Sequence, residues 1–133
     1  DKRFIFRFHP MINKFNFLRK YFGTKLKIPK NIIFSNKSFE EDLKNSKYVL
    51  YRGSAAAIQA LGANKIVIYM EFNNEINIDP LYMLKKKFYV KKTSQLDKIF
   101  KDKKIVQKNA KNIRFTKEYF GEPNFFPLLK YLN

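Results

Sequence analysis

Residues 47–72, KYVLYRGSAAAIQALGANKIVIYMEF, have the clearest secondary-structure pattern of this chain. It starts with a short β-prone apolar run, turns sharply at Gly53-Ser54, and continues through a segment rich in Ala and Leu that favours helix. After Gly62 comes the run IVIYM, residues 66–70, whose continuous apolar character is typical of a strand covered on both faces. The order strand, helix, strand predicts a right-handed crossover between parallel strands.

The same alternation extends to both sides of this unit. Strands are predicted at residues 3–8, 31–34, 48–51, 66–70 and 87–90. Helices are predicted at residues 11–22, 38–46, 55–61, 81–84, 94–100, 103–119 and 125–132. Ser38 and Glu41 have the spacing of a capping box, and Gly23 and Gly62 are predicted helix stops. The pattern predicts an α/β, Rossmann-like three-layer sandwich with a mostly parallel sheet of about five strands and helices on both faces.

Length and composition limit the classes of protein that this chain can belong to. Its 133 residues predict one domain, residues 1–133, and 45% hydrophobic residues supply a core. With no cysteine and a single histidine, disulfide scaffolds, thiolate chemistry and His/Cys metal centres are excluded, so neither a metal nor a cofactor is expected. No apolar run approaches the ~20 residues of a membrane-spanning helix, so a soluble or peripheral domain is expected. Because Asp1 already lies in a strand-like run, we interpret the chain as a piece of a longer protein.

The charge of the chain is strongly positive and unevenly distributed. The 28 Lys and Arg residues against 11 Asp and Glu residues give a formal net charge of +17. The cations gather in residues 14–30 and 85–104, whereas residues 53–84 carry Lys65 against three acidic residues. Two interpretations stay open: a face for an anionic partner, or solvated lysines that reflect AT-rich codon usage.

Candidate binding residues follow the predicted strands, because ligands of open parallel sheets bind beyond the carboxyl ends of the strands. The Arg52-Gly53-Ser54-Ala55 turn is the best anion-binding candidate, since a helix start offers unpaired N–H groups and Gly53 lets the backbone approach a phosphate. In the competing interpretation, Ser54 only caps its own helix. His9 is the other candidate, and the alternative for this lone histidine is a structural role.

Several other phosphate-binding classes are excluded by missing motifs. The chain has neither GxxxxGK[ST] nor GxGxxG among its four glycines. A phosphorelay receiver would need acidic residues where this chain has His9-Pro10 and Arg52-Gly53.

The segment of residues 47–72 together with FRFHP, residues 6–10, resembles a known family. It is similar to the C-terminal, donor-nucleotide half of GT-B-fold glycosyltransferases of bacterial surface polysaccharide synthesis. FRFHP resembles the His-Pro motif of bacterial sialyltransferases and of the glycerophosphotransferases of teichoic acid synthesis. This likeness implies a nucleotide-sugar donor, CMP- or CDP-linked, and a missing N-terminal domain that supplies the acceptor site, without which the fragment would be inactive.

The resemblance also implies roles for individual residues. His9 would act as the catalytic residue at the donor phosphate, held also by Ser54 and the backbone of Gly53 and Ala55. Further contacts are implied for Arg7 and Arg52 at the phosphate, Phe34 and Ser35 at the base, and Gln59 and Glu71 at the ribose or sugar. The chain departs from the family pattern at Ala55 and Gln59, where relatives often have a hydroxyl and a glutamate.

Two other function classes remain as hypotheses. One is a basic α/β module that binds nucleic acid through residues 14–30 and 85–104, although RNA- and DNA-binding motifs are missing. The other is a peripheral domain whose lysines contact anionic lipid or a polyanionic glycan. For the glycosyltransferase hypothesis, the expected location is the cytoplasm, at the inner face of a bacterial membrane.

Overall fold

The computed structural model describes residues 2–23, 27–71, 76 and 78–119 of the chain. Its contacts group into two compact units, Asp1–Asn45 and Ser46–Asn133, and each unit is described by itself.

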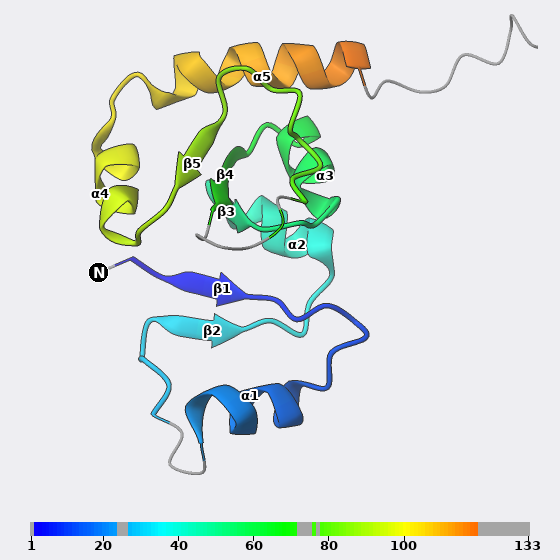
Figure 1. Ribbon diagram of the computed structural model, residues 1–133, viewed down its shortest axis with the longest axis vertical. Coiled ribbons are helices and arrows are strands. Elements are labelled where there is room, and N and C mark those ends of the chain that lie inside the picture. Colours follow the sequence, from blue (N-terminus) through cyan, green and yellow to red (C-terminus); the bar gives the residue numbers. More distant parts are fainter. Residues whose placement is uncertain (1, 24–26, 72–75, 77, 120–133) are drawn as a thin grey trace, which may run out of the picture. The chain divides into compact units, whose positions relative to one another are not determined.

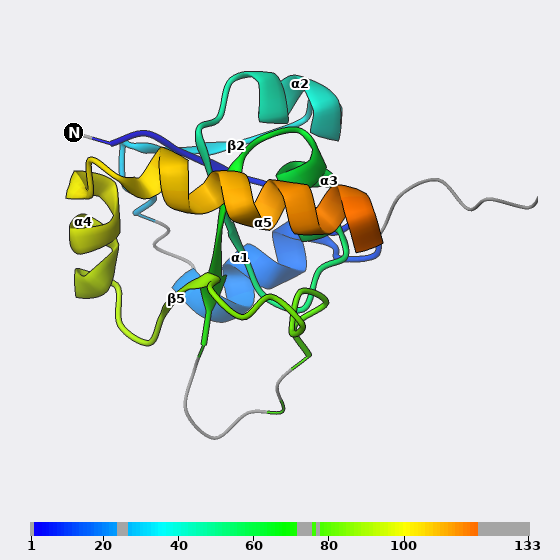
Figure 2. The same ribbon diagram turned by 90° about the horizontal axis from the view of Figure 1, so that it is seen from above.

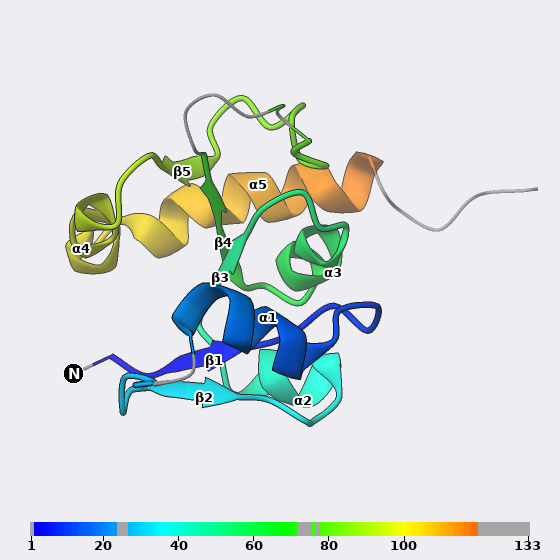
Figure 3. The same ribbon diagram turned by 60° about the horizontal axis from the view of Figure 1, so that its bottom comes forward.

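The first unit contains a two-stranded sheet and two helices. In chain order these are β1 (Phe4–Phe6), α1 (Lys14–Phe22), β2 (Ile32–Phe34) and α2 (Phe39–Lys44). Strands β1 and β2 run parallel, with Phe4 opposite Ile32 and Phe6 opposite Phe34 (Figure 3). The connection between parallel strands runs through α1, which is the crossover that the sequence predicts.

Both helices of the first unit begin at side-chain caps. The Asn13 side chain accepts a hydrogen bond of 3.0 Å from the backbone N–H of Asn16, and α1 ends at Gly23, whose φ of 70° favours glycine. At α2, Ser38 Oγ accepts from the Glu41 N–H while Glu41 Oε2 accepts from the Ser38 N–H, which confirms the predicted capping box. The hydrogen bond from the Ser38 backbone lowers the pKa of Glu41 below its usual value.

Aromatic side chains make up most of the apolar packing in the first unit. Phe6, Phe8, Phe17 and Phe34 contact one another with ring centroids 4.9–6.3 Å apart. Among the described residues of this unit, Leu43 is the only buried hydrophobic one. The unit is therefore held by an aromatic cluster that stays partly open to solvent.

The second unit contains a three-stranded parallel sheet in the order β3-β4-β5. Its elements are β3 (Tyr48–Tyr51), α3 (Ala56–Gly62), β4 (Ile66–Met70), β5 (Phe88–Val90), α4 (Ser94–Lys101) and α5 (Ile105–Tyr119). The strand β4 lies between the other two strands, and α3 and α4 lie on opposite sides of the sheet (Figures 1 and 2).

Strand β4 forms the centre of the core because both of its faces are covered. Ile66 and Ile68 pack with Val90 of β5, Leu96 of α4 and Ile105 of α5 in one buried cluster. Successive side chains of a strand point to opposite faces, so Val67 and Tyr69 face the other side, where α3 contacts β3 and β4. The alanines of α3 let this helix approach the sheet closely.

Helix α5 holds the amino ends of two strands through a pair of buried asparagines. Asn109 Nδ2 donates to the carbonyl of Lys65, directly before β4, and Asn112 Nδ2 donates to the carbonyl of Lys86, two residues before β5. Residues three apart on a helix are about 5–6 Å apart, close to the ~4.8 Å between neighbouring strands. The helix repeat therefore matches the sheet spacing.

The structure confirms the α/β class, the parallel strands and the helices on both sides of the second unit's sheet. The number of sheets differs from the prediction. The five strands form one sheet of two strands and one of three, whereas a single five-stranded sheet was predicted. Residues 81–84 form a turn rather than a helix. Helix α3 ends at Gly62, its last helical residue, and Asn64, at φ 61°, takes the left-handed conformation. The helix predicted at residues 125–132 lies outside the described residues.

If β4 is the centre of the core, Ile68→Ala should lower the free energy of unfolding by about 2–5 kcal/mol, because the Ile68 side chain is fully buried. Ile76→Ala is the matched control, since Ile76 is 85% exposed, and it should change the free energy by less than about 0.5 kcal/mol. Urea unfolding measures both; equal effects would contradict the assignment of β4 to the core.

Candidate functional site

The carboxyl edge of the three-stranded sheet brings together residues that follow all three strands. Arg52 follows β3, Glu71 follows β4 and Lys91 follows β5. The Glu71 N–H donates to the Val90 carbonyl at 2.9 Å, which continues the pairing of β4 with β5. The Lys91 ammonium lies 3.7 Å from the Glu71 carboxylate, and both side chains are open to solvent, so this ion pair adds little stability.

The predicted anion-binding turn lies between β3 and α3. Gly53 has a φ of 64°, a conformation that glycine adopts without strain. Ser54 Oγ accepts a hydrogen bond of 3.3 Å from the Ala56 N–H, and the Ser54 carbonyl accepts from the Ala57 N–H. Ser54 and Ala55 are both exposed. The Ser54 hydroxyl thus binds one backbone N–H at the start of its own helix, as in the competing interpretation in which Ser54 only caps that helix.

The space beside Gly53 is occupied by a side chain of the same unit. A Cβ at Gly53 would lie 2.7 Å from Cγ1 of Ile78 and closer still to its Cδ1. Ile78 itself is 60% exposed. Ile78 thus uses the close approach that the glycine permits.

The other two predicted residues of this unit lie on neighbouring elements. Gln59 is exposed on α3, and its carbonyl accepts from the Ala63 N–H at 2.9 Å. Glu71 lies at the end of the adjacent strand.

In the first unit, a buried carboxylate holds two of the predicted site residues. Asp42 of α2 accepts from Ser35 Oγ at 2.8 Å with one oxygen and from Arg7 Nη1 at 2.9 Å with the other. Arg7 also donates to the carbonyl of Lys37 at 2.6 Å. Asp42 is only 8% exposed, and a buried carboxylate needs such partners. Arg7 and Ser35 thus neutralise and orient Asp42, tying α2 to β1 and β2.

His9 and Phe34 also have local partners in this unit. His9 is exposed, and its Nδ1 accepts a hydrogen bond of 3.2 Å from the Met11 N–H, which places the proton of the neutral ring on Nε2. Phe34 stacks on Phe8 at 5.6 Å, and the Lys14 ammonium lies over its ring at 4.9 Å.

A second buried carboxylate lies in the connection between β4 and β5. Asp79 Oδ1 accepts from the Tyr51 hydroxyl at 2.8 Å and from the Leu81 N–H at 2.9 Å, while Oδ2 accepts from the Lys87 ammonium. Lys87 also lies over the ring of Tyr69, 5.3 Å from its centroid. This network fixes the β4–β5 connection to β3 and to the start of β5. Burial, together with the Asp79 carboxylate, raises the pKa of Tyr51 well above its ordinary value.

Sequence reasoning missed the structural partners of these sites. Asp79 lies just before the helix predicted at residues 81–84, and Asp42 lies within the helix predicted at residues 38–46, but nothing in their sequence positions indicated that either would be buried. Asn109 and Asn112 carried no signal except their three-residue spacing on a long predicted helix, which places both on one face.

The described residues offer neither a metal-binding cluster nor a membrane-spanning helix. They contain no group of three or more His, Cys, Asp or Glu side chains placed to hold a metal ion. None of their helices has the length and apolar character needed to cross a membrane. Comparisons with protein-family models, with curated proteins and with solved structures find no match to this chain.

Removing the Tyr51 hydroxyl should destabilise the second unit, because Asp79 loses one donor in a buried site. Tyr51→Phe is expected to lower the free energy of unfolding by about 1–3 kcal/mol near pH 7, measured by urea unfolding.

The effect should also depend on pH. Because the pKa of Tyr51 is raised in the fold, its contribution is complete below about pH 10, the ordinary tyrosine value, and declines as the pH rises further. Tyr82→Phe is the control, since Tyr82 is 71% exposed. A Tyr51→Phe variant as stable as this control would contradict the network.

Proposed function

We propose that this chain is the donor-binding domain of a glycosyltransferase-like enzyme, and that it binds a nucleotide-sugar at the carboxyl edge of the β3-β4-β5 sheet. The observation that carries the proposal is the junction of β3 with α3. There, a left-handed Gly53 is followed by the exposed Ser54 and Ala55 at a helix start, directly after a parallel strand. Such junctions present backbone N–H groups to phosphates.

The chemistry proposed for the site is electrostatic. As the bond between sugar and phosphate breaks, negative charge grows on the leaving nucleotide, and N–H groups and cations held nearby stabilise that charge. Arg52 and the Ser54 hydroxyl come from this junction. The acceptor would bind to a domain outside this sequence, with the enzyme at the inner face of a bacterial membrane.

The position of Ile78 imposes a condition on ligand binding. A phosphate that contacts Gly53 must displace the Ile78 side chain, whose atoms lie over the glycine. Displacement moves apolar atoms that are already 60% exposed, so the cost is modest. Removing these atoms should therefore strengthen binding.

The test is an NMR titration of the ¹⁵N-labelled chain with CMP, CDP and UDP. We expect a cytidine nucleotide to shift the amides of Gly53, Ser54 and Ala55, and Ile78→Ala to tighten binding by about threefold to tenfold because the glycine is already uncovered. Ile76→Ala is the control, since Ile76 lies two residues away and is 85% exposed.

Two outcomes would count against the proposal. If these amides stay unshifted with every nucleotide, the donor site is not at this junction. If the lysines of residues 85–104 instead respond to a short oligonucleotide and lose that response in high salt, the chain is a nucleic-acid-binding module.

A further inference from the structure

The start of the first unit combines positive charge with exposed apolar side chains. Residues 2–39 carry ten Lys and Arg residues and no Asp or Glu. Of the acidic residues that follow, Asp42 binds Arg7 and Ser35, and Glu41 caps its own helix. The positive charge of this unit is therefore concentrated in the residues before α2.

The turn before α1 presents apolar side chains to solvent. The His9 carbonyl accepts a hydrogen bond of 2.9 Å from the Ile12 N–H, which closes a turn with Pro10 and Met11 at its tip. Met11 is 87% exposed, and Ile12 is exposed as well. Turns usually carry Gly, Asn, Asp or Ser next to proline, because these residues suit both the backbone and water. Here two neighbouring large apolar side chains take their place.

Helix α1 adds a further apolar side chain and a cation on one face. Phe17 contacts the rings of Phe6 and Phe8, so its side of α1 lies on the β1-β2 sheet (Figure 3). An α-helix has about 3.6 residues per turn, which places Phe15 nearly opposite to Phe17. Phe15 is 71% exposed, and the exposed Arg19 follows it by four residues, so the two share a face.

Five exposed side chains thus lie within ten consecutive residues, and we call them the α1 surface: Met11, Ile12, Phe15, Arg19 and Lys20. Isolated apolar side chains are common on protein surfaces, but a group of them beside cations marks an interaction site. Peripheral proteins bind membranes with this combination, because apolar side chains enter the boundary between headgroups and acyl chains while cations stay at the lipid phosphates.

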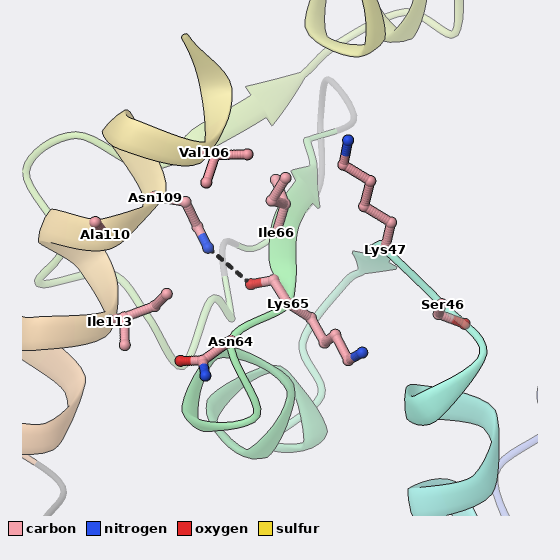
Figure 4. A pocket seen from close by; sticks show the side chains of 9 residues that line it. All are labelled: Ser46, Lys47, Asn64, Lys65, Ile66, Val106, Asn109, Ala110 and Ile113. Atoms are coloured by element: carbon pink, nitrogen blue, oxygen red, sulfur yellow. Dashed lines mark hydrogen bonds between the residues drawn. The ribbon is translucent and has the colours of Figure 1, made fainter. Parts of the chain in front are cut away.

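The lysines of the second unit are arranged differently. At the cavity between α5 and the start of β4, Val106 and Ile113 supply aliphatic side chains from α5, whereas Lys47 and Lys65 extend away from that helix in different directions (Figure 4). Positive charge and apolar groups are separated there. The cavity therefore lacks the combination that the α1 surface has.

Charge selects the partner of the α1 surface. The second unit carries 17 Lys and Arg residues against 7 Asp and Glu residues, so neither this unit nor a second copy of the chain complements a cationic surface. The partner must be anionic. Nucleic acid would bind the cations, but its bases stack on aromatic rings and do not cover the aliphatic side chains of Met11 and Ile12. An anionic bilayer supplies both phosphates and an apolar interior.

We propose that the α1 surface binds membranes that contain anionic phospholipid. Met11, Ile12 and Phe15 enter the acyl-chain boundary, and Arg19 and Lys20 contact the phosphates. The proposal does not depend on nucleotide-sugar binding, because the proposed donor site at residues 52–55 belongs to the other unit and no nucleotide takes part in the membrane contact.

The charge contribution is tested by co-sedimentation of the full chain with vesicles of phosphatidylcholine, with and without about one third phosphatidylglycerol. The anionic vesicles should bind at least tenfold more tightly. Each cation at such a surface contributes about fivefold in affinity, so the double variant Arg19→Gln/Lys20→Gln should lose at least tenfold. The control Lys85→Gln/Lys86→Gln removes the same charge from exposed lysines of the second unit and should lose less than threefold. Equal binding to both vesicles, or equal losses in both variants, would overturn the proposal.

Insertion of the apolar side chains is tested by fluorescence, because the chain contains no tryptophan. Phe15→Trp introduces a single reporter, and Tyr82→Trp is the control, since both parent side chains are 71% exposed. With anionic vesicles, the emission of Phe15→Trp should shift to the blue and be quenched by brominated acyl chains, and that of Tyr82→Trp should not.

Three results of the fluorescence experiment would contradict membrane insertion. The emission of Phe15→Trp could stay unchanged with anionic vesicles, or brominated lipid could quench both variants equally. In the third case, a short oligonucleotide quenches Phe15→Trp and vesicles do not, which would make the α1 surface a nucleic-acid-binding surface.

Discussion

The parallel pairing of β4 with a strand on each side is the constraint on which the second unit depends. A strand paired in this way must have both faces covered, and Ile66 to Tyr69 are all at most 4% exposed. Its two ends need partners as well. The Asn109 and Asn112 amides bind carbonyls at the amino ends of β4 and β5, and the Asp79 network fixes the β4–β5 connection to Tyr51 and Lys87.

The sequence predicted the elements better than their assembly. Continuous apolar character identified β4, and the capping-box spacing identified the start of α2, because both signals are local. Strand pairing depends on contacts between distant residues, and the short apolar runs of β1 and β2 resemble those of β3 and β5. One sheet was therefore expected where the structure has two. The turn at residues 81–84 lacked the length that stabilises a helix.

The candidate site illustrates the same limit. The rule for parallel sheets correctly placed the 52–55 turn at a strand end, but it gave no information on what each side chain contacts. Arg7 and Ser35 follow strands as expected, yet both bind the carboxylate of Asp42, and Ile78 lies over Gly53. The unpaired oxygen of Asn109 could not be predicted, because it results from the packing of α5 against the start of β4. Burial and hydrogen bonding, more than position, decide which polar residues are available to a ligand.

Because β4 is held on both faces and at both ends, it should be the most stable element of the second unit. Native-state hydrogen exchange with NMR detection measures the stability of each element through its amides. We expect the amides of Ile68 and Tyr69 to exchange only through global unfolding, with a free energy equal to that from urea unfolding. Exchange of these amides through local opening, as fast as that of the amides in α4, would contradict it.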